Sequence, residues 1–134
     1  VTMGIDIAKC KKLKIFEFEG NDDMSYPPTE VQLKGQEGVL RYFRQILDCP
    51  HSNIMMIDDF ELSEVDSIIF RYPNLTWLDV SKNNLVKVPA ELRQLQHIES
   101  LNVSRNKLGC IPRIISLMPT LVDLAIDSNG IEAI

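Results

Sequence analysis

The sequence repeats itself every 23 residues, and this period limits the possible folds more than any other feature. One copy sets apolar residues around an asparagine, at Leu75, Leu78, Val80, Asn83 and Leu85. The same frame returns twice, at Ile98, Leu101, Val103, Asn106 and Leu108, and at Leu121, Leu124, Ile126, Asn129 and Ile131. A chain with so short a period is expected to fold as a stack of similar units that bury their apolar faces against one another.

The alternation inside each copy indicates a short strand. Leu78 and Val80 are two residues apart, so both point to the same side of the strand and fill the interior. Asn83 follows the strand, where its amide can hydrogen-bond backbone groups that the turn leaves unpaired. We therefore expect the asparagines to be structural, and we expect Leu78, Leu101 and Leu124 to form one buried column.

These frames resemble the leucine-rich-repeat family, in its intracellular type of about 23 residues whose links read LPxxIxxL. The links here are Val88-Pro89, Leu92 and Leu95 in one copy and Ile111-Pro112, Ile115 and Met118 in the next. The resemblance implies an α/β fold, a solenoid with short parallel strands on a concave face and helical or irregular turns on the convex side. An amphipathic helix is expected to interrupt the array.

Two weaker copies come before the three clear ones. Counting back 23 residues from Leu75 gives Ser52, Met55, Ile57, Phe60 and Leu62. Phe60 stands in the asparagine position and cannot bond the turn backbone, so we expect an irregular turn or a local cap there. A still earlier copy has the frame Leu13, Phe16, Phe18, Asn21 and Met24, with Cys10 in a leucine position as an expected buried thiol.

The segment between these copies predicts a helix from about Gln36 to Asp48 that ends at Pro50. Its apolar stripe consists of Val39, Leu40, Phe43, Ile46 and Leu47. The segment is similar to one that closes intracellular leucine-rich-repeat arrays in Roco and Ras-group proteins, through Pro27, Pro28, Glu30, Val31, Gly35, Val39, Tyr42 and Phe43. The resemblance implies that the helix covers exposed core; alternatively, the stripe binds a partner helix.

Three regions follow from this pattern. Residues 1–27 are expected to form a partial repeat unit, residues 28–50 a linker and helix that close or interrupt the array, and residues 51–134 further repeat units. In the last region the first unit is degenerate and the last is truncated. Because both ends fall inside repeats, we expect further repeats or domains in the same parent chain.

No pattern in the sequence indicates an enzyme, a cofactor site or a metal site. The glycines form no phosphate-binding loop, and His51 and His97 lack the cysteine and histidine partners of a zinc site. A net charge of −5 argues against nucleic acid, and no apolar run reaches the length of a membrane span, about 20 residues. Three cysteines without a pairing pattern favour a reducing compartment, so we expect a cytoplasmic location.

The resemblance implies that the outward residues of the strands bind a protein partner. Trp77 is the strongest candidate, because an exposed aromatic side chain on a binding face is often an anchor; alternatively, it packs on Ile54 and Met56. The acidic residues of this face favour a partner with a basic patch. The candidate residues are Met56, Asp58, Trp77, Asp79, Lys82, Asn102, Arg105, Asp123 and Asp127.

The sequence therefore predicts a non-enzymatic protein-protein interaction module of a larger intracellular scaffold. Two other functions fit the same pattern. The segment could regulate a multidomain signalling enzyme similar to the Roco GTPases and kinases, or it could be a structural component of a large assembly such as an axoneme.

Overall fold

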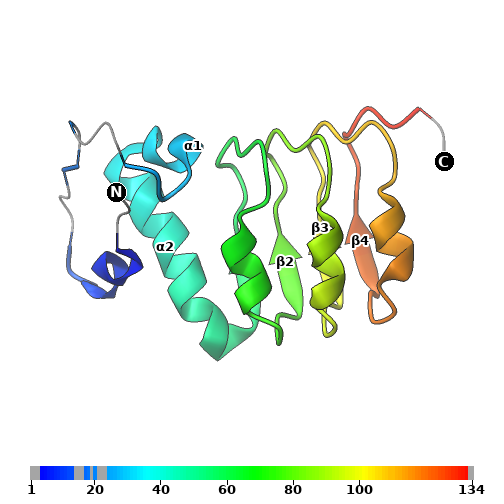
Figure 1. Cartoon of the computed structure of the whole chain (residues 1–134), viewed down its shortest axis with the longest axis horizontal. Helices are drawn as coiled ribbons and strands as arrows, with labels where there is room; N and C mark the ends of the chain where they lie inside the picture. The colour runs from blue at the N-terminus through cyan, green and yellow to red at the C-terminus, as the bar shows by residue number, and fades with distance from the viewer. Residues whose placement is uncertain (1–3, 14–16, 19, 21–23, 133–134) are drawn as a thin grey trace.

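The computed structural model describes residues 4–13, 17–18, 20 and 24–132, and its elements lie in one row from the N-terminal to the C-terminal end (Figure 1). The short 3-10 helix η1 and the α-helices α1 and α2 precede a series of strands and further 3-10 helices. Their bounds are η1 (Ile5–Lys9), α1 (Thr29–Gln32), α2 (Gly35–Ser52), β1 (Ile54–Met56), η2 (Ser67–Arg71), β2 (Trp77–Asp79), η3 (Ala90–Gln94), β3 (Ser100–Asn102), η4 (Arg113–Leu117) and β4 (Asp123–Ala125).

The four strands form one parallel sheet in the order β1-β2-β3-β4, and the short helices η2, η3 and η4 return the chain on its other side. Equivalent residues pair across neighbouring strands, so that Trp77 faces Ser100 and Ser100 faces Asp123. This register equals the 23-residue period of the sequence. The predicted α/β solenoid is therefore confirmed.

The expected leucine column is present, although its last member is less buried than predicted. Leu78 pairs with Leu101 and Leu101 pairs with Leu124, and the first two are 1% exposed. Leu124 is 39% exposed, because β4 has a neighbouring strand on one side only. The core is thus continuous from β1 to β3 and opens at β4.

The buried asparagines join each repeat to the one before it, as the frame predicts. Asn106 donates through Nδ2 to the carbonyl of Val103 in its own repeat and to that of Val80 in the preceding one, both at 3.0 Å. Its Oδ1 accepts from the backbone N–H of Leu85 at 3.0 Å. Asn83 and Asn129 make equivalent contacts. The same three side chains therefore close the turns and hold the register.

Helix α2 is longer than predicted and does not end at Pro50. Pro50 lies in its last turn, where the missing N–H removes one hydrogen bond without ending the helix. The helix ends at Ser52 and is capped by Asn53, whose left-handed backbone has φ 58° and whose N–H donates to the Cys49 carbonyl at 2.7 Å. At the other end, Gly35 adopts φ 75°, a conformation that glycine permits between α1 and α2.

The apolar stripe of α2 is buried within the chain. Val39, Phe43 and Ile46 are fully buried and belong to the same core cluster as the strands. The stripe therefore covers the β1 end of the core, as the resemblance implied, and it is not available to a partner helix. The polar side of α2 also completes the free edge of β1. Gln45 Oε1 accepts from the Met56 N–H at 2.9 Å, and Ser52 Oγ accepts from the Ile54 N–H at 3.1 Å.

Phe60 explains the irregular turn that its position predicted. Its ring is fully buried, lies edge-on against Tyr42 at 5.1 Å between centroids, and is covered by the Arg41 guanidinium at 3.9 Å. Glu61 has a left-handed backbone in this turn, unlike its equivalents Asn84 and Lys107, whereas the left-handed Asp59 matches the regular turns at Lys82 and Arg105. An aromatic ring beneath α2 thus occupies the asparagine position, in agreement with the expectation of an irregular turn or a local cap.

The earliest predicted repeat is only partly visible. Phe16 and Asn21 lie outside the described residues, so its frame remains a prediction. Cys10 is exposed, and the expectation of a buried thiol at this position is wrong. The residues around it form the short helix η1, which packs against α2 and does not place Cys10 in the core.

Leu101→Ala tests the buried column. Removing this side chain leaves a cavity between β2 and β4, and we expect the free energy of unfolding to fall by about 2–5 kcal/mol. Urea denaturation followed by circular dichroism measures this change. Leu117→Ala is the matched control, because Leu117 is an exposed leucine of η4 and should cost much less. Equal losses in the two variants would contradict the assignment of the core.

Asn106→Leu tests the bridge between repeats. The substitution leaves the carbonyls of Val80 and Val103 and the N–H of Leu85 without their partner, so we expect a loss of about 1–3 kcal/mol. Thermal unfolding of the same protein measures it. Asn74→Leu, at an exposed asparagine, should leave the melting temperature nearly unchanged.

Candidate functional site

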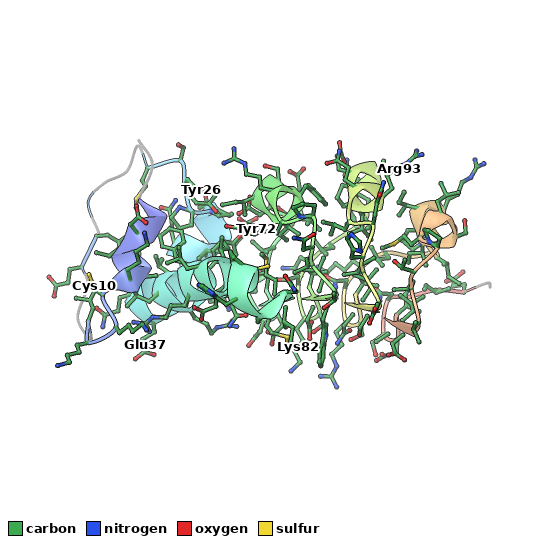
Figure 2. The ribbon with its side chains drawn as sticks, turned by 90° about the horizontal axis from the view of Figure 1, so that it is seen from below. Cys10, Tyr26, Glu37, Tyr72, Lys82 and Arg93 are labelled. Carbon is green, nitrogen blue, oxygen red and sulfur yellow. The ribbon has the colours of Figure 1, made fainter. Side chains whose placement is uncertain are left out.

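The candidate surface is the outward side of the sheet, which we call the strand face. It consists of the outward residues of each strand and of the turn that follows. The outward residues are Ile54, Met56 and Asp58 at β1, Trp77, Asp79 and Ser81 at β2, Ser100, Asn102 and Ser104 at β3, and Asp123, Ala125 and Asp127 at β4. Figure 2 shows Lys82, from the turn after β2, on the opposite side of the molecule from Arg93 of η3. The strand face is thus separate from the side that carries the short helices.

Trp77 is the large apolar side chain that the strand face presents to solvent, with 44% of its surface exposed. The register places it beside Ile54, and Met56 lies two residues along the same neighbouring strand. Ile54 and Met56 are both half-buried. An apolar patch of these three side chains therefore occupies the β1–β2 end of the face.

The centre of the strand face is less available than the sequence suggested. Asp79 is only 8% exposed, and its two oxygens accept from the Ser81 N–H at 2.9 Å and from Asn102 Nδ2 at 3.3 Å. Asn102 Oδ1 in turn accepts from the Ser104 hydroxyl at 2.7 Å. Asp79 is therefore part of a polar network that joins β2 to β3, and its prediction as a free binding residue is corrected. Asn102 is half-buried and keeps part of its surface.

Two other candidates at the β1 side are engaged by α2. Asp58 lies 3.6 Å from Arg41 Nη1, and its carbonyl accepts from Arg41 Nη2 at 2.8 Å. The Met56 backbone N–H is held by Gln45. Arg41 and Gln45 are not among the residues predicted from the sequence, although their spacing of four residues on the polar side of the predicted helix is a signal for a shared contact. Helix α2 therefore borders the strand face and fixes its first strand.

The charged candidates at the other side of the face are exposed. Asp123 and Asp127 lie at β4, and Lys82 and Arg105 lie in the turns after β2 and β3. In the part of the chain that the structure describes, none of the four forms an ion pair. Lys82 and Arg105 have left-handed backbones, with φ 55° and 53°. These four charges are therefore open to a partner.

A second surface lies along α2. A hollow of about 570 Å³ is lined there by Leu13, Leu40, Glu37, Arg44 and Asp48, together with Arg41 and Gln45. Charges of both signs line it, so it favours no single kind of ligand.

In the described residues, no group of three or more His, Cys, Asp or Glu side chains is placed to hold a metal ion. None of the described helices combines the length and apolar character of a membrane span. The strand face is the stronger candidate.

A hydrogen-bonded group of three side chains holds α2 against the repeats. Asp66 Oδ2 accepts from the hydroxyls of Tyr42 and Tyr26, and its Oδ1 accepts from the Ile68 N–H at the start of η2. Burial raises the pKa of Tyr42 and of Tyr26 well above the ordinary tyrosine value, and the Asp66 carboxylate raises both further. Both hydroxyls therefore stay protonated and keep donating at neutral pH.

Tyr42→Phe tests this group, because the variant keeps the ring and loses the donor to Asp66. We expect the free energy of unfolding at pH 7 to fall by about 1.5–3 kcal/mol, since the acceptor is a carboxylate. A tyrosine whose folded pKa is raised stabilises the fold fully below its unfolded pKa of about 10, and this stabilisation is lost as pH rises above that value. Denaturation between pH 7 and 11 should show a shallower alkaline loss in Tyr42→Phe than in the wild type.

Comparison with known proteins identifies the repeat. Residues 54–132, more than half of the chain, match the family model described as Leucine rich repeat. A probable serine/threonine-protein kinase of Dictyostelium discoideum is 31% identical over 67 residues, which are 49% of this chain and 5% of that protein. The matched part thus spans a small fraction of the length of this curated relative. The family match agrees with the four parallel strands and the asparagine bridges, and the chain belongs to the leucine-rich-repeat family.

Proposed function

We propose that this chain is a non-catalytic module that binds a protein partner across the strand face. The observation that carries the proposal is the exposed indole of Trp77 on a rigid parallel sheet. Leucine-rich-repeat domains generally bind proteins, and solenoids generally use their extended concave surface to do so. Exposed aromatic side chains at the centre of such surfaces commonly contribute much of the binding energy.

The proposal gives the candidate residues different roles. Trp77 is the anchor, with Met56 beside it. Lys82, Arg105, Asp123 and Asp127 form a charged rim that selects the partner and its orientation, with the two carboxylates favouring a partner with a basic group. The remaining candidates, Asp58, Asp79 and Asn102, hold the strands and α2 in place. We also propose three regions, residues 1–27, 28–50 and 51–134, although the last residues of α2, which runs to Ser52, cross the second boundary.

A second proposal concerns the parent protein. Similarity to a probable serine/threonine-protein kinase supports a role as the regulatory segment of a multidomain signalling protein. The full-length reading frame tests it, because a kinase or GTPase domain in the same chain would support the proposal and repeats alone would contradict it. We further propose a cytoplasmic location, which the three free cysteines support.

Site-specific photocrosslinking tests the binding face. A photoreactive phenylalanine analogue replaces Ser100, between Trp77 and Asp123, and in a second protein it replaces Arg93 on the opposite side. We expect a crosslinked protein from position 100 alone, competed by unlabelled chain. Adding Trp77→Ala to the protein with the probe at position 100 should lower the yield of the crosslinked partner about tenfold or more, as loss of an aromatic anchor does. Equal crosslinking from both positions, or unchanged capture after Trp77→Ala, would count against the strand face.

A further inference from the structure

The first residues of the four strands form a row with two chemically different ends. This row, which we call the anchor row, consists of Ile54, Trp77, Ser100 and Asp123, one from each strand in direct register. Its β1–β2 end is apolar and its β4 end is a carboxylate. Ser100, in the middle, is small and half-buried, so it leaves space between the two ends.

The neighbouring rows of outward residues present fewer accessible side chains to a partner than the anchor row does. In the next row, Asp79 and Asn102 bond to each other and to their own strands, which leaves Asp79 nearly inaccessible. In the row after that, Ser81 and Ser104 are buried, Asp58 is paired with Arg41, and only Asp127 is exposed. The exposed groups of the anchor row are therefore Trp77 and Asp123, both on the same face.

The distance between these two residues selects the form of the partner. Neighbouring strands are about 4.8 Å apart, so two strand spacings place the Trp77 and Asp123 positions about 10 Å apart. In an α-helix, side chains seven residues apart lie on one face and are separated by about 10.5 Å. In an extended chain, side chains on one face are separated by about 6.6 or 13 Å. A helix matches the spacing better than an extended segment does.

The width of the face agrees with a helix. Each strand is three residues long, which corresponds to about 10 Å, close to the diameter of an α-helix with its side chains. A helix that follows the anchor row would cross the strands nearly at right angles. Its apolar side chain would contact Trp77 and Ile54, and a cationic side chain two turns further would reach Asp123.

We propose that the strand face binds an amphipathic helix of a partner protein that carries an apolar residue and, seven residues away, a lysine or arginine. This inference rests on the proposed function and names the chemistry of the partner. Asp123 is then a specificity residue, because a cationic side chain gains a partner there and an anionic one is repelled. Asp127 lies two residues after the end of β4, outside the anchor row, and should contribute much less.

Synthetic helical peptides without tryptophan test the inference. One peptide carries leucine and lysine seven residues apart, a second has glutamate in place of the lysine, and a third moves the lysine to the opposite face of the helix. Trp77 is the single tryptophan of the chain, so its emission reports binding at the anchor row directly. We expect the first peptide to shift the emission and to bind about tenfold more tightly than the other two.

Charge reversal at Asp123 provides the decisive comparison. Asp123→Lys should reverse the preference, so that the glutamate peptide binds about tenfold more tightly than the lysine peptide, and Asp123→Asn should make the two about equal. Asp127→Lys is the matched control and should change either affinity by less than about threefold. Circular dichroism checks that each variant keeps the wild-type fold.

Several results would overturn the inference. These are an unchanged preference in folded Asp123→Lys, an equal effect of Asp127→Lys, and no shift of Trp77 emission by any peptide up to about 1 mM. Photocrosslinking from position 100 distinguishes the two levels of the proposal. If a protein is captured at position 100 but Asp123→Lys does not reverse the peptide preference, the proposed binding face is supported and the helix inference is contradicted. If no protein is captured and no preference is reversed, both the proposed function and the helix inference are contradicted.

Discussion

The bridging amide of the buried asparagines is the interaction on which the rest of the structure depends. A strand of three residues makes too few ladder hydrogen bonds to fix its own position. Asn83 donates to the carbonyls of Val80 and Ile57, one in its own repeat and one in the repeat before it, both at 2.9 Å. The amide thus satisfies buried backbone groups and sets the stacking distance at the same time. The regular register of the outward side chains is a consequence of that fixed stacking.

Helix α2 takes the place of a strand at one end of the sheet. An unpaired edge of a sheet exposes backbone donors and acceptors that can pair with other chains. Here Gln45 and Ser52 accept from N–H groups of β1, and Arg41 donates to the Asp58 carbonyl just after it. The same helix fills the core beneath with its apolar stripe and is held by Asp66. The helix therefore covers the β1 end of the sheet as a preceding repeat would, and its side chains form the hydrogen bonds that the backbone of a repeat would form.

The period alone was enough to predict the register of Leu78 and Leu101 and the structural role of the asparagines. It does not predict how outward residues pair with one another, and it therefore does not distinguish the bonded carboxylate of Asp79 from the exposed one of Asp123. Asp79 and Asn102 occupy equivalent positions 23 residues apart, which was a signal for the contact, but the direction of each side chain is set by its neighbours. The hydrogen bond between Tyr42 and Asp66 cannot be predicted from the sequence, because no local pattern relates a residue of α2 to a turn 24 residues later.

The direction of the asparagine bridges has a consequence for synthesis on the ribosome. The N–H groups of Leu62, Leu85 and Leu108 each bond an asparagine that lies 21 residues later in the chain. Chains emerge from the N-terminal end, so each turn stays incomplete until most of the following repeat has left the exit tunnel. Helix α2 precedes all of these turns and needs no later asparagine for its own backbone hydrogen bonds. Each turn of the nascent array is therefore completed only after most of the following repeat has emerged, and helix α2 can form before the first of these turns.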